Sequence, residues 1–278
     1  MSARGEHVVE RPGWASGDID LERPSVARIY DYFLGGAHNF AADRAVANRT
    51  LEAMPELRGV VLTNRALLRR MVRHLLDLGV RQFLDLGSGI PTAGNVHEIA
   101  HRVDPAAKVV YVDVDAVAVA HGRSLLLEEP NAVALRADVR ETKTVLESAE
   151  VRSVLDFDQP VAMLMIALLH FVPDSDEPCR IISEYLDPLV PGSYLGISHS
   201  GFEEGEEGEG AAEARRTYSS QVAQMTHRTT GEITSLFGDL EVLDPGVVRM
   251  PYWHPESPDD VDEASARFPG FAALARKR

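Results

Sequence analysis

Two glycines one residue apart follow an acidic strand end in the segment Phe83–Thr92, which reads FLDLGSGIPT. A second acid, Asp113, closes the next apolar run 24 residues after Gly89. A glycine-rich turn between a strand and a helix lets the backbone approach a ligand closely, and an acid on the following strand can hold ribose hydroxyls. The pairing therefore predicts a site for an adenosine-containing cofactor.

The glycine spacing distinguishes between such cofactors. The dinucleotide fingerprint has glycines at its first, third and sixth positions, and the sixth position here is Thr92. The turn also contains Pro91 and no Lys or Arg that could attract a pyrophosphate. S-adenosylmethionine has no phosphate, and its donor groups suit the acids Asp85, Asp113 and Asp138. The pattern favours S-adenosylmethionine over NAD.

Two other motifs indicate different chemistry. An H-E-x-x-H sequence at His97–His101 could place two histidines on one helix face to bind zinc. Because the apolar residues of this helix should face the sheet, we expect surface histidines, predict no metal site and keep a zinc hydrolase as a remote alternative. A serine hydrolase is a similarly weak alternative, since Gly196–Ser200 lacks the second glycine of the nucleophile elbow.

After Gly79 strand-like and helix-like segments alternate, which predicts an α/β fold with a doubly wound, mostly parallel sheet. The predicted strands are Gln82–Leu86, Lys108–Val112, Ala132–Arg136, Val161–Ile166 and Tyr194–Ser198. The predicted helices between them are Thr92–Val103, Ala116–Glu128, Lys143–Ala149 and Glu177–Leu186, the last capped by Asp176. Two short runs, Leu240–Leu243 and Val247–Trp253, flank a turn-forming Asp-Pro-Gly and predict an antiparallel edge hairpin.

Three helices are predicted before the first strand. The first follows Ser25 and ends at Gly35-Gly36, the second covers Ala41–Ala53, and the third starts near Thr63. We therefore divide the chain into a helical N-terminal extension, residues 1–62, and a cofactor-binding domain, residues 63–278. Polar and aromatic residues crowd the first helix, so we expect the extension to fold over the cofactor and shape the acceptor pocket, with Gly35 and Gly36 allowing close approach.

Composition limits the partners and the compartment. The 278-residue chain has a net charge of −15, which would repel a phosphate backbone, so we expect no nucleic-acid partner. No apolar run is long enough for a membrane span and no secretory signal is visible, so we expect a cytoplasmic protein that does not bind membranes. Cys179 is the only cysteine, which excludes an internal disulfide.

The segment that follows the last predicted parallel strand is strongly acidic. Six glutamates fall within residues 203–213, and glycines interrupt them. We expect a solvated loop here, with a lid over the active site as the alternative. A helix is predicted at Ala211–Thr226, and Thr229 with Glu232 forms a capping box before the next one.

These motifs resemble the class I methyltransferases that use S-adenosylmethionine, and within them a bacterial branch of S-adenosyl methyltransferases whose acceptor is unknown. The likeness extends over Pro24–Pro255. The residues that carry it are Pro24–Arg44, Asn64-Arg65, Phe83–Thr92, Val110–Asp115, Ala137–Arg140, Val161–Asp174 and Pro191–Ser200. The chain departs from the wider class at Pro91, which stands where a third glycine is common.

The resemblance implies a cofactor site at the ends of four strands. Its residues are Asp85 at the ammonium, Gly87, Ser88 and Gly89 under the methionine moiety, Asp113 at the ribose, Asp138 and Val139 at the adenine, and Ala167 and Leu168 beside the cofactor. Arg65 is a candidate for the cofactor carboxylate. Asp115 is expected to cap the next helix rather than to contact the ribose.

The predicted function is transfer of a methyl group from S-adenosylmethionine to an unidentified small-molecule acceptor. This in-line displacement depends chiefly on alignment and can proceed without a dedicated base. If the acceptor must lose a proton, His170 and Tyr32 are the candidate bases. The alternative is a regulatory or degenerate protein that binds S-adenosylmethionine without turnover.

Overall fold

The computed structural model describes residues 19–91, 94–203, 219–220, 222–257, 261 and 270–278. In this part of the chain nine strands form one sheet in the order β3-β2-β1-β4-β5-β9-β7, with β6 paired to β5 and β8 to β9. The strands are β1 Gln82–Leu86, β2 Lys108–Asp113, β3 Ala132–Arg136, β4 Ala162–Ile166, β5 Tyr194–Phe202, β6 Arg228–Thr229, β7 Glu241–Val242, β8 Val248–Arg249 and β9 Gly270–Arg276. Strands β1 to β5 are mutually parallel, and β9 is antiparallel to β5.

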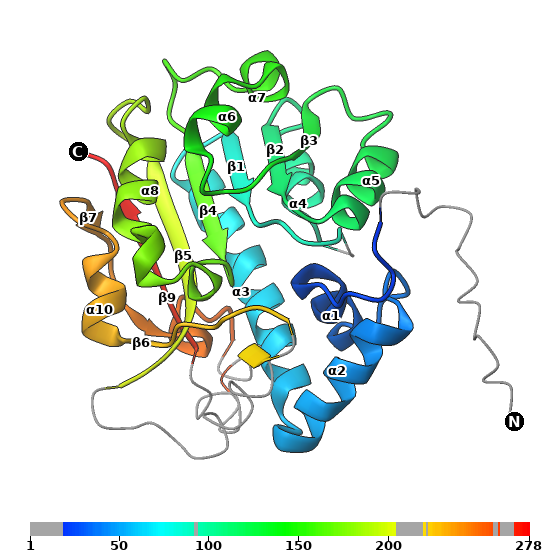
Figure 1. The fold of residues 1–278 in the computed structure, drawn as a ribbon. Coiled ribbons are helices and arrows are strands. Elements are labelled where there is room, and N and C mark those ends of the chain that lie inside the picture. The colour runs from blue at the N-terminus through cyan, green and yellow to red at the C-terminus, as the bar shows by residue number, and fades with distance from the viewer. Residues whose placement is uncertain (1–18, 92–93, 204–218, 221, 258–260, 262–269) are drawn as a thin grey trace, which may run out of the picture.

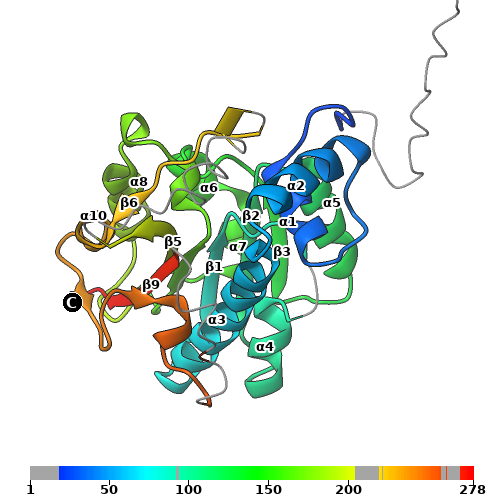
Figure 2. The ribbon, with the colours of Figure 1, turned by 90° about the horizontal axis from the view of Figure 1, so that it is seen from below.

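Helices cover both faces of this sheet (Figures 1 and 2). The helices are α1 Val26–Phe33, α2 Ala41–Ala53, α3 Leu57–Asp77, α4 Val96–Val103, α5 Ala116–Leu125, α6 Thr142–Glu147, α7 Ala149–Val154, α8 Pro178–Leu186 and α10 Thr230–Ser235, with short 3₁₀ turns η1 Leu169–Phe171, η2 Asp174–Asp176 and η3 Met250–Tyr252. None of the helices in these described ranges is both long and apolar enough to cross a membrane.

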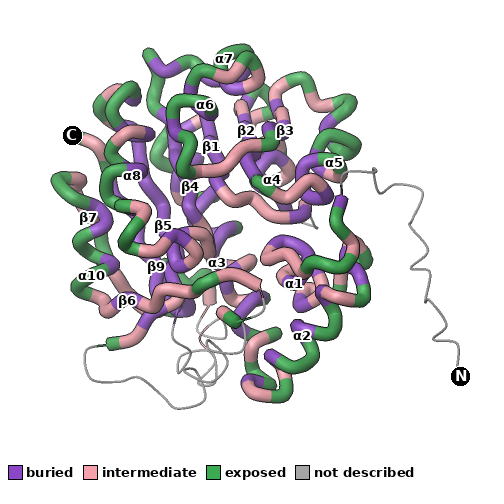
Figure 3. The backbone as a smooth tube through the Cα atoms, in the orientation of Figure 1, coloured by how far each residue is buried: buried purple, intermediate pink, exposed green. Residues whose placement is uncertain are grey.

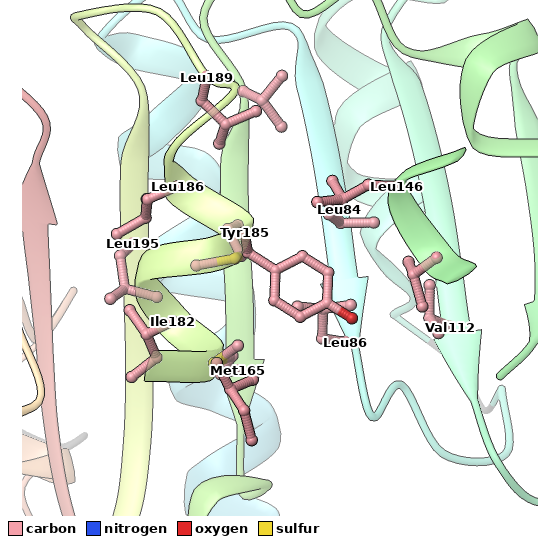
Figure 4. Close-up of a cluster of buried hydrophobic side chains, with 14 of the residues drawn as sticks. Leu84, Leu86, Val112, Leu146, Met165, Ile182, Tyr185, Leu186, Leu189 and Leu195 are labelled. Atoms are coloured by element: carbon pink, nitrogen blue, oxygen red, sulfur yellow. The ribbon is translucent and has the colours of Figure 1, made fainter. Parts of the chain in front are cut away.

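Alternate residues of each central strand enter opposite cores. In β2, Val110 and Val112 pack with α6, α7 and α8, whereas Val109 and Tyr111 pack with α3 and α4. Figure 4 shows part of the first core around Tyr185, and Figure 3 shows that the strands are buried. Burial on both faces explains why these strands are near-continuous apolar runs in the sequence.

The strand order places a switch point beside the glycine turn. The chain moves from β1 outward to β2 and β3, then returns across β1 to form β4 on its other side. The connections that leave β1 and β4 therefore diverge at their carboxyl ends, which is where ligands bind in open α/β sheets. The predicted fold is confirmed at this level, a doubly wound and mostly parallel sheet with antiparallel strands at one edge.

The N-terminal helices pack together beside these carboxyl ends. Ile29, Phe33, Val46, Ala47 and Val61 form one buried cluster that joins α1, α2 and α3. Helix α3 begins at Leu57, directly after the Pro55-Glu56 turn, so its predicted start near Thr63 is wrong. The division drawn after residue 62 therefore falls inside α3.

The sheet edge differs from the sequence prediction. The described strands β7 and β8 do not pair with each other as a hairpin; both pair antiparallel with β9. Strand β9 was missed, because its core residues are three alanines beside Phe271 and Leu274, and alanine has a low strand propensity. The antiparallel edge thus depends on a strand from the C-terminus.

Several local predictions are also corrected. The predicted helix Lys143–Ala149 is two short helices, α6 and α7. Helix α8 has Pro178 in its first turn, but its N-cap is Glu177 instead of Asp176, which lies in η2. The capping box of Thr229 and Glu232 is confirmed.

The acidic stretch lies almost entirely outside the described residues. Glu203 is described and pairs with Arg249 at 2.9 Å. The predicted helix Ala211–Thr226 also falls mostly outside them, and residues 223–227, which are described, are not helical.

Candidate methyl-donor and acceptor site

The turn after β1 is tied to the end of β2. The amides of Gly87 and Ser88 both donate to the carbonyl of Val112, at 2.8 and 3.1 Å. Gly87 and Gly89 have φ angles of 70° and 67°, a left-handed conformation that favours glycine. A Cβ atom on Gly87 would also come within 2.6 Å of the Leu168 side chain. The two glycines are thus required by backbone conformation and, at Gly87, by close packing.

Asp113 connects the glycine turn to the next helix. One carboxylate oxygen accepts from the Gly89 amide at 2.7 Å and the other accepts from the Asp115 amide at 2.8 Å. Burial nevertheless raises the pKa of Asp113 to about 6. Asp115 accepts from the amides of Val117 and Ala118, so its predicted role as the cap of α5 is confirmed.

Asp85 is a buried acid at the end of β1. It is 5% exposed, and it accepts no hydrogen bond from any residue that the structure describes, yet it lines the cavity. Burial raises the pKa of Asp85 to about 7, while the positive charge of Arg65 opposes this rise and the carboxylate of Asp113 adds to it. A ligand that is cationic or donates hydrogen bonds would stabilise the ionised form of this buried carboxylate.

Arg65 lies in α3 and lines the same cavity. Its guanidinium donates to the carbonyl of Gly94 at 3.2 Å, and its charge acts on Asp85. The structure therefore brings Arg65 to the methionine side of the predicted site, next to the turn.

The loop after β3 holds an acid that is already paired. Asp138 accepts from the Arg140 backbone amide and guanidinium, and Arg140 also pairs with Asp176 at 3.0 Å. Hydrogen bonds from Arg140 lower the pKa of Asp138. The Val139 carbonyl accepts from the Tyr185 hydroxyl at 3.0 Å, which fixes this loop over the core.

The residue after β4 has an unusual backbone. Ala167 has a φ of 54°, in the left-handed region that residues with a Cβ atom rarely adopt. Its amide donates to the hydroxyl and to the carbonyl of Ser198 on β5, at 2.9 and 3.2 Å. These bonds hold Ala167 at the cavity wall, where Leu168 covers Gly87.

The two candidate bases lie in different places. His170 is buried and lines the cavity, and burial, with nearby histidines and Arg228, holds its pKa well below the ordinary value. Tyr32 does not line the described cavity, because its hydroxyl turns away to donate to Asn48 at 2.9 Å. The structure thus brings only His170 to the site.

The glycine pair after α1 is also not at the cavity. Gly35 has a φ of 80° and ends α1, and a Cβ atom on Gly36 would collide with the Asp31 carboxylate. Asp31 accepts from the His38 amide and the Asn39 side chain at 2.9 and 2.8 Å. The glycines therefore shape the turn between α1 and α2, and neither lines the described cavity.

A series of hydrogen-bonded side chains that runs from α1 to β5 was not predicted from the sequence. The Asn64 side chain donates to the Tyr30 hydroxyl at 2.9 Å, and the Ser198 hydroxyl donates to Asn64 at 2.6 Å. All three residues line the cavity. The Asn64-Arg65 pair was noted only for its arginine, and no spacing in the sequence joins Asn64 to Tyr30 and Ser198.

The H-E-x-x-H residues have structural partners. His97 contacts the Tyr111 hydroxyl at 2.7 Å, and His97 is buried, not on the surface as predicted. His101 contacts the Ala107 carbonyl and Glu129, while Glu98 accepts from the Gly94 amide. In the ranges that the structure describes, no group of three potential ligand side chains surrounds them.

A cavity of about 920 Å³ joins the residues at the strand ends, Arg65, His170 and the hydrogen-bonded residues Tyr30, Asn64 and Ser198. It is lined by the strand ends after β1, β2, β3 and β4 and by residues of α1, the end of α2 and the start of α3. Ser25, just before α1, donates from its hydroxyl to Asp115, which fixes the extension to the cofactor side. Residues of the N-terminal extension therefore form part of the cavity wall.

This fold is the class I, Rossmann-like fold of S-adenosylmethionine methyltransferases. The same fold occurs in geranyl diphosphate C-methyltransferase from Streptomyces coelicolor, whose structure holds S-adenosylhomocysteine, with a TM-score of 0.50, 14% identity and coverage of 75% of this chain and 76% of that one.

Closer relatives identify the family. Residues 12–278 match the family model described as S-adenosyl methyltransferase, and the chain belongs to this family. A Thermobifida fusca protein assigned to the methyltransferases has a TM-score of 0.88 and 37% identity over 98% of this chain and 99% of its own. A DUF574 family protein from Streptomyces avermitilis has a TM-score of 0.87 and 35% identity over 93% and 99%. No curated protein matches the chain.

Proposed function

We propose that the chain binds S-adenosylmethionine at the carboxyl ends of β1 to β4 and transfers its methyl group to a small-molecule acceptor bound in the same cavity. The observation that carries this proposal is the buried Asp85 carboxylate, which faces the cavity and accepts no hydrogen bond from a described residue. An ammonium group would supply both the charge and the donors that this acid needs.

The other strand ends suit the remaining parts of the donor. Asp113 is held in place by two backbone amides and can accept from ribose hydroxyls. Gly87 and Gly89 bring backbone to the cavity without side chains, and Arg65 offers a cation to a carboxylate. Asp138 and Val139 stand on the loop where the adenine would lie, and Ala167 and Leu168 flank the donor.

The donor supplies an activated methyl group on a sulfonium. In the transfer, an acceptor lone pair forms the new bond to the methyl carbon, the carbon–sulfur bond breaks, and its electron pair stays on sulfur. The protein contributes alignment of the two reactants and exclusion of water by the N-terminal helices.

His170 is a neutral hydrogen-bonding residue in this proposal, and not a strong base. A group whose pKa is far below neutrality takes a proton poorly at neutral pH. The Ser200 amide donates to the His170 Nδ1 atom at 3.4 Å. His170 would therefore not take up a proton released by the acceptor.

Turnover tests this proposal against binding without catalysis. The purified chain is incubated with methyl-labelled S-adenosylmethionine and a small-metabolite extract, and the products are separated. We expect label in a small molecule and stoichiometric S-adenosylhomocysteine, both absent with Asp85→Asn. Tight binding of the donor with no labelled product from extracts of several bacteria would favour a regulatory or degenerate protein.

A further inference from the structure

The cavity has an apolar end, which we define by Tyr30, Phe33, Leu57, Val61, Phe171 and Met225. These residues line the cavity and belong to or pack on the cluster that joins α1, α2 and α3. They come from the N-terminal helices, from η1 and from the segment before β6, and none comes from the strand ends that carry Asp85 and Asp113. The donor and acceptor sides of the cavity are therefore built from different parts of the chain.

Charge is confined to the donor side. Five arginines line the cavity in the described ranges, and none of them belongs to the apolar end. Arg28 pairs with Asp43, Arg140 pairs with Asp138 and Asp176, Arg136 donates to the Val114 carbonyl, and the other two are Arg23 and Arg65. Arg65 acts on Asp85. No Lys or Glu lines the cavity in the described ranges. A charged acceptor buried at the apolar end would lose its hydration without gaining an opposite charge, which is strongly unfavourable.

A series of hydrogen bonds reaches the apolar end, and each group in it donates to the next group toward that end. The Ala167 amide donates to Ser198, Ser198 donates to Asn64, and Asn64 donates to the Tyr30 hydroxyl. The last step, from the Tyr30 hydroxyl to the Val61 carbonyl, spans 3.4 Å, which is beyond the usual 2.5–3.0 Å for such a bond. Chains of aligned hydrogen bonds polarise one another, so the Tyr30 proton is available as a donor.

Two buried histidines near this end, His170 and His199, add no positive charge. Burial keeps the pKa of His170 well below its ordinary value and lowers the pKa of His199 to about 3. Arg228, which lies beside His199, is itself paired with Asp174 at 2.7 Å.

We propose that the apolar end takes a neutral, largely apolar acceptor molecule with one hydrogen-bond-accepting atom placed at the Tyr30 hydroxyl. The inference rests on the proposed function, and it narrows the small-molecule acceptor to an uncharged class. Tyr30 would be a positioning residue that orients the acceptor toward the donor, and it has no role in proton transfer.

Four probes of similar size test the charge and the hydrogen bond separately. The full chain is saturated with S-adenosylhomocysteine and titrated with para-cresol, toluene, para-toluate and benzylammonium, with binding followed by ligand-observed NMR. We expect para-cresol to bind about tenfold more tightly than either ion. We also expect it to bind about threefold to tenfold more tightly than toluene, which lacks the accepting oxygen.

Two tyrosine variants form a matched pair. Tyr30→Phe keeps the packing of the ring and should remove the preference for para-cresol over toluene. Tyr32→Phe changes a hydroxyl that bonds Asn48 outside the cavity, and the preference should be unchanged. Thermal unfolding of both variants checks that they are folded.

Three outcomes would overturn the inference. They are equal or tighter binding of an ion, a cresol preference that survives Tyr30→Phe, and no binding of any probe to the loaded protein. Failure of S-adenosylhomocysteine to bind at all is a separate result, since it would overturn the proposed function itself.

Discussion

The backbone amide of Gly89 donates to the Asp113 carboxylate across 2.7 Å, which joins the turn after β1 directly to the end of β2. The other oxygen of Asp113 holds the Asp115 amide at the start of α5. The glycine turn, the end of β2 and the start of α5 thus meet at one buried acid. The glycine turn and Asp113, the candidate ribose-binding residue, are therefore held in a fixed position relative to each other.

Replacing Asp113 should therefore weaken donor binding strongly. Asp113→Ala removes both backbone contacts and the acceptor for ribose, so we expect at least a tenfold loss of S-adenosylmethionine affinity by calorimetry. Asp156→Asn is the matched control, because Asp156 is exposed in the loop before β4 and should leave the affinity unchanged. Equal affinity in Asp113→Ala and the wild type would contradict the assignment.

Donor binding should depend on pH. Asp85, with a pKa near 7, and Asp113, with a pKa near 6, must both be ionised to hold the ammonium and the ribose hydroxyls well. The affinity for S-adenosylmethionine should rise as pH increases from about 5 to about 8. A flat affinity profile over this range would show that neither acid titrates on binding.

The same raised pKa makes Asp85 costly for the unliganded fold. Between the ordinary value of 3.8 and about 7, native Asp85 keeps a proton that the unfolded chain has lost, so stability falls as pH rises through this window. The cost approaches about 4 kcal/mol at most, since each pKa unit is about 1.4 kcal/mol. Chemical denaturation at pH about 8 should find Asp85→Asn more stable than the wild type, although it binds the donor poorly. An Asp85→Asn variant that is less stable than the wild type at this pH would contradict the claim that ionised Asp85 destabilises the unliganded fold.

Two glycine substitutions should act in opposite directions. Gly59 lies exposed within α3 with open space around it, so Gly59→Ala should stabilise the protein by about 0.5–1 kcal/mol. Gly87→Ala must adopt a φ of 70° and displace Leu168, so it should destabilise the protein and weaken donor binding. Urea unfolding of both variants measures the difference.

The cap of α5 gives a test that does not involve ligand. Asp115→Ala removes the bonds to the Val117 and Ala118 amides and to Ser25, and should cost about 1–2 kcal/mol of unfolding free energy. Asp115→Asn can still cap the helix, so it should recover most of this loss. Similar losses of unfolding free energy in both variants would show that the stability depends on the charge of Asp115 and not on the helix cap.

The donor side was predictable from the sequence because its residues are local to strand ends. The segment from Asp85 to Gly89 and the acid Asp113 lie at positions set by two buried strands, and parallel strands bring their carboxyl ends to the same sheet edge. The apolar runs of these strands therefore locate the strand ends, where these polar residues stand.

The acceptor side could not be predicted in the same way. Tyr30, Asn64 and Ser198 are up to 168 residues apart in the sequence. Their contacts depend on how α1 and α3 pack against β5. Tyr30 and Tyr32 are two residues apart in α1, and the packing of α1 directs only Tyr30 into the cavity. Strand β9 was missed for a related reason, since its alanines become buried only by pairing with β5.

Calorimetric titration of the full chain with S-adenosylmethionine, S-adenosylhomocysteine and NAD tests the central claim most directly. The site geometry predicts binding of both adenosyl compounds with one-to-one stoichiometry, and no heat from NAD. Binding of NAD alone would contradict the account.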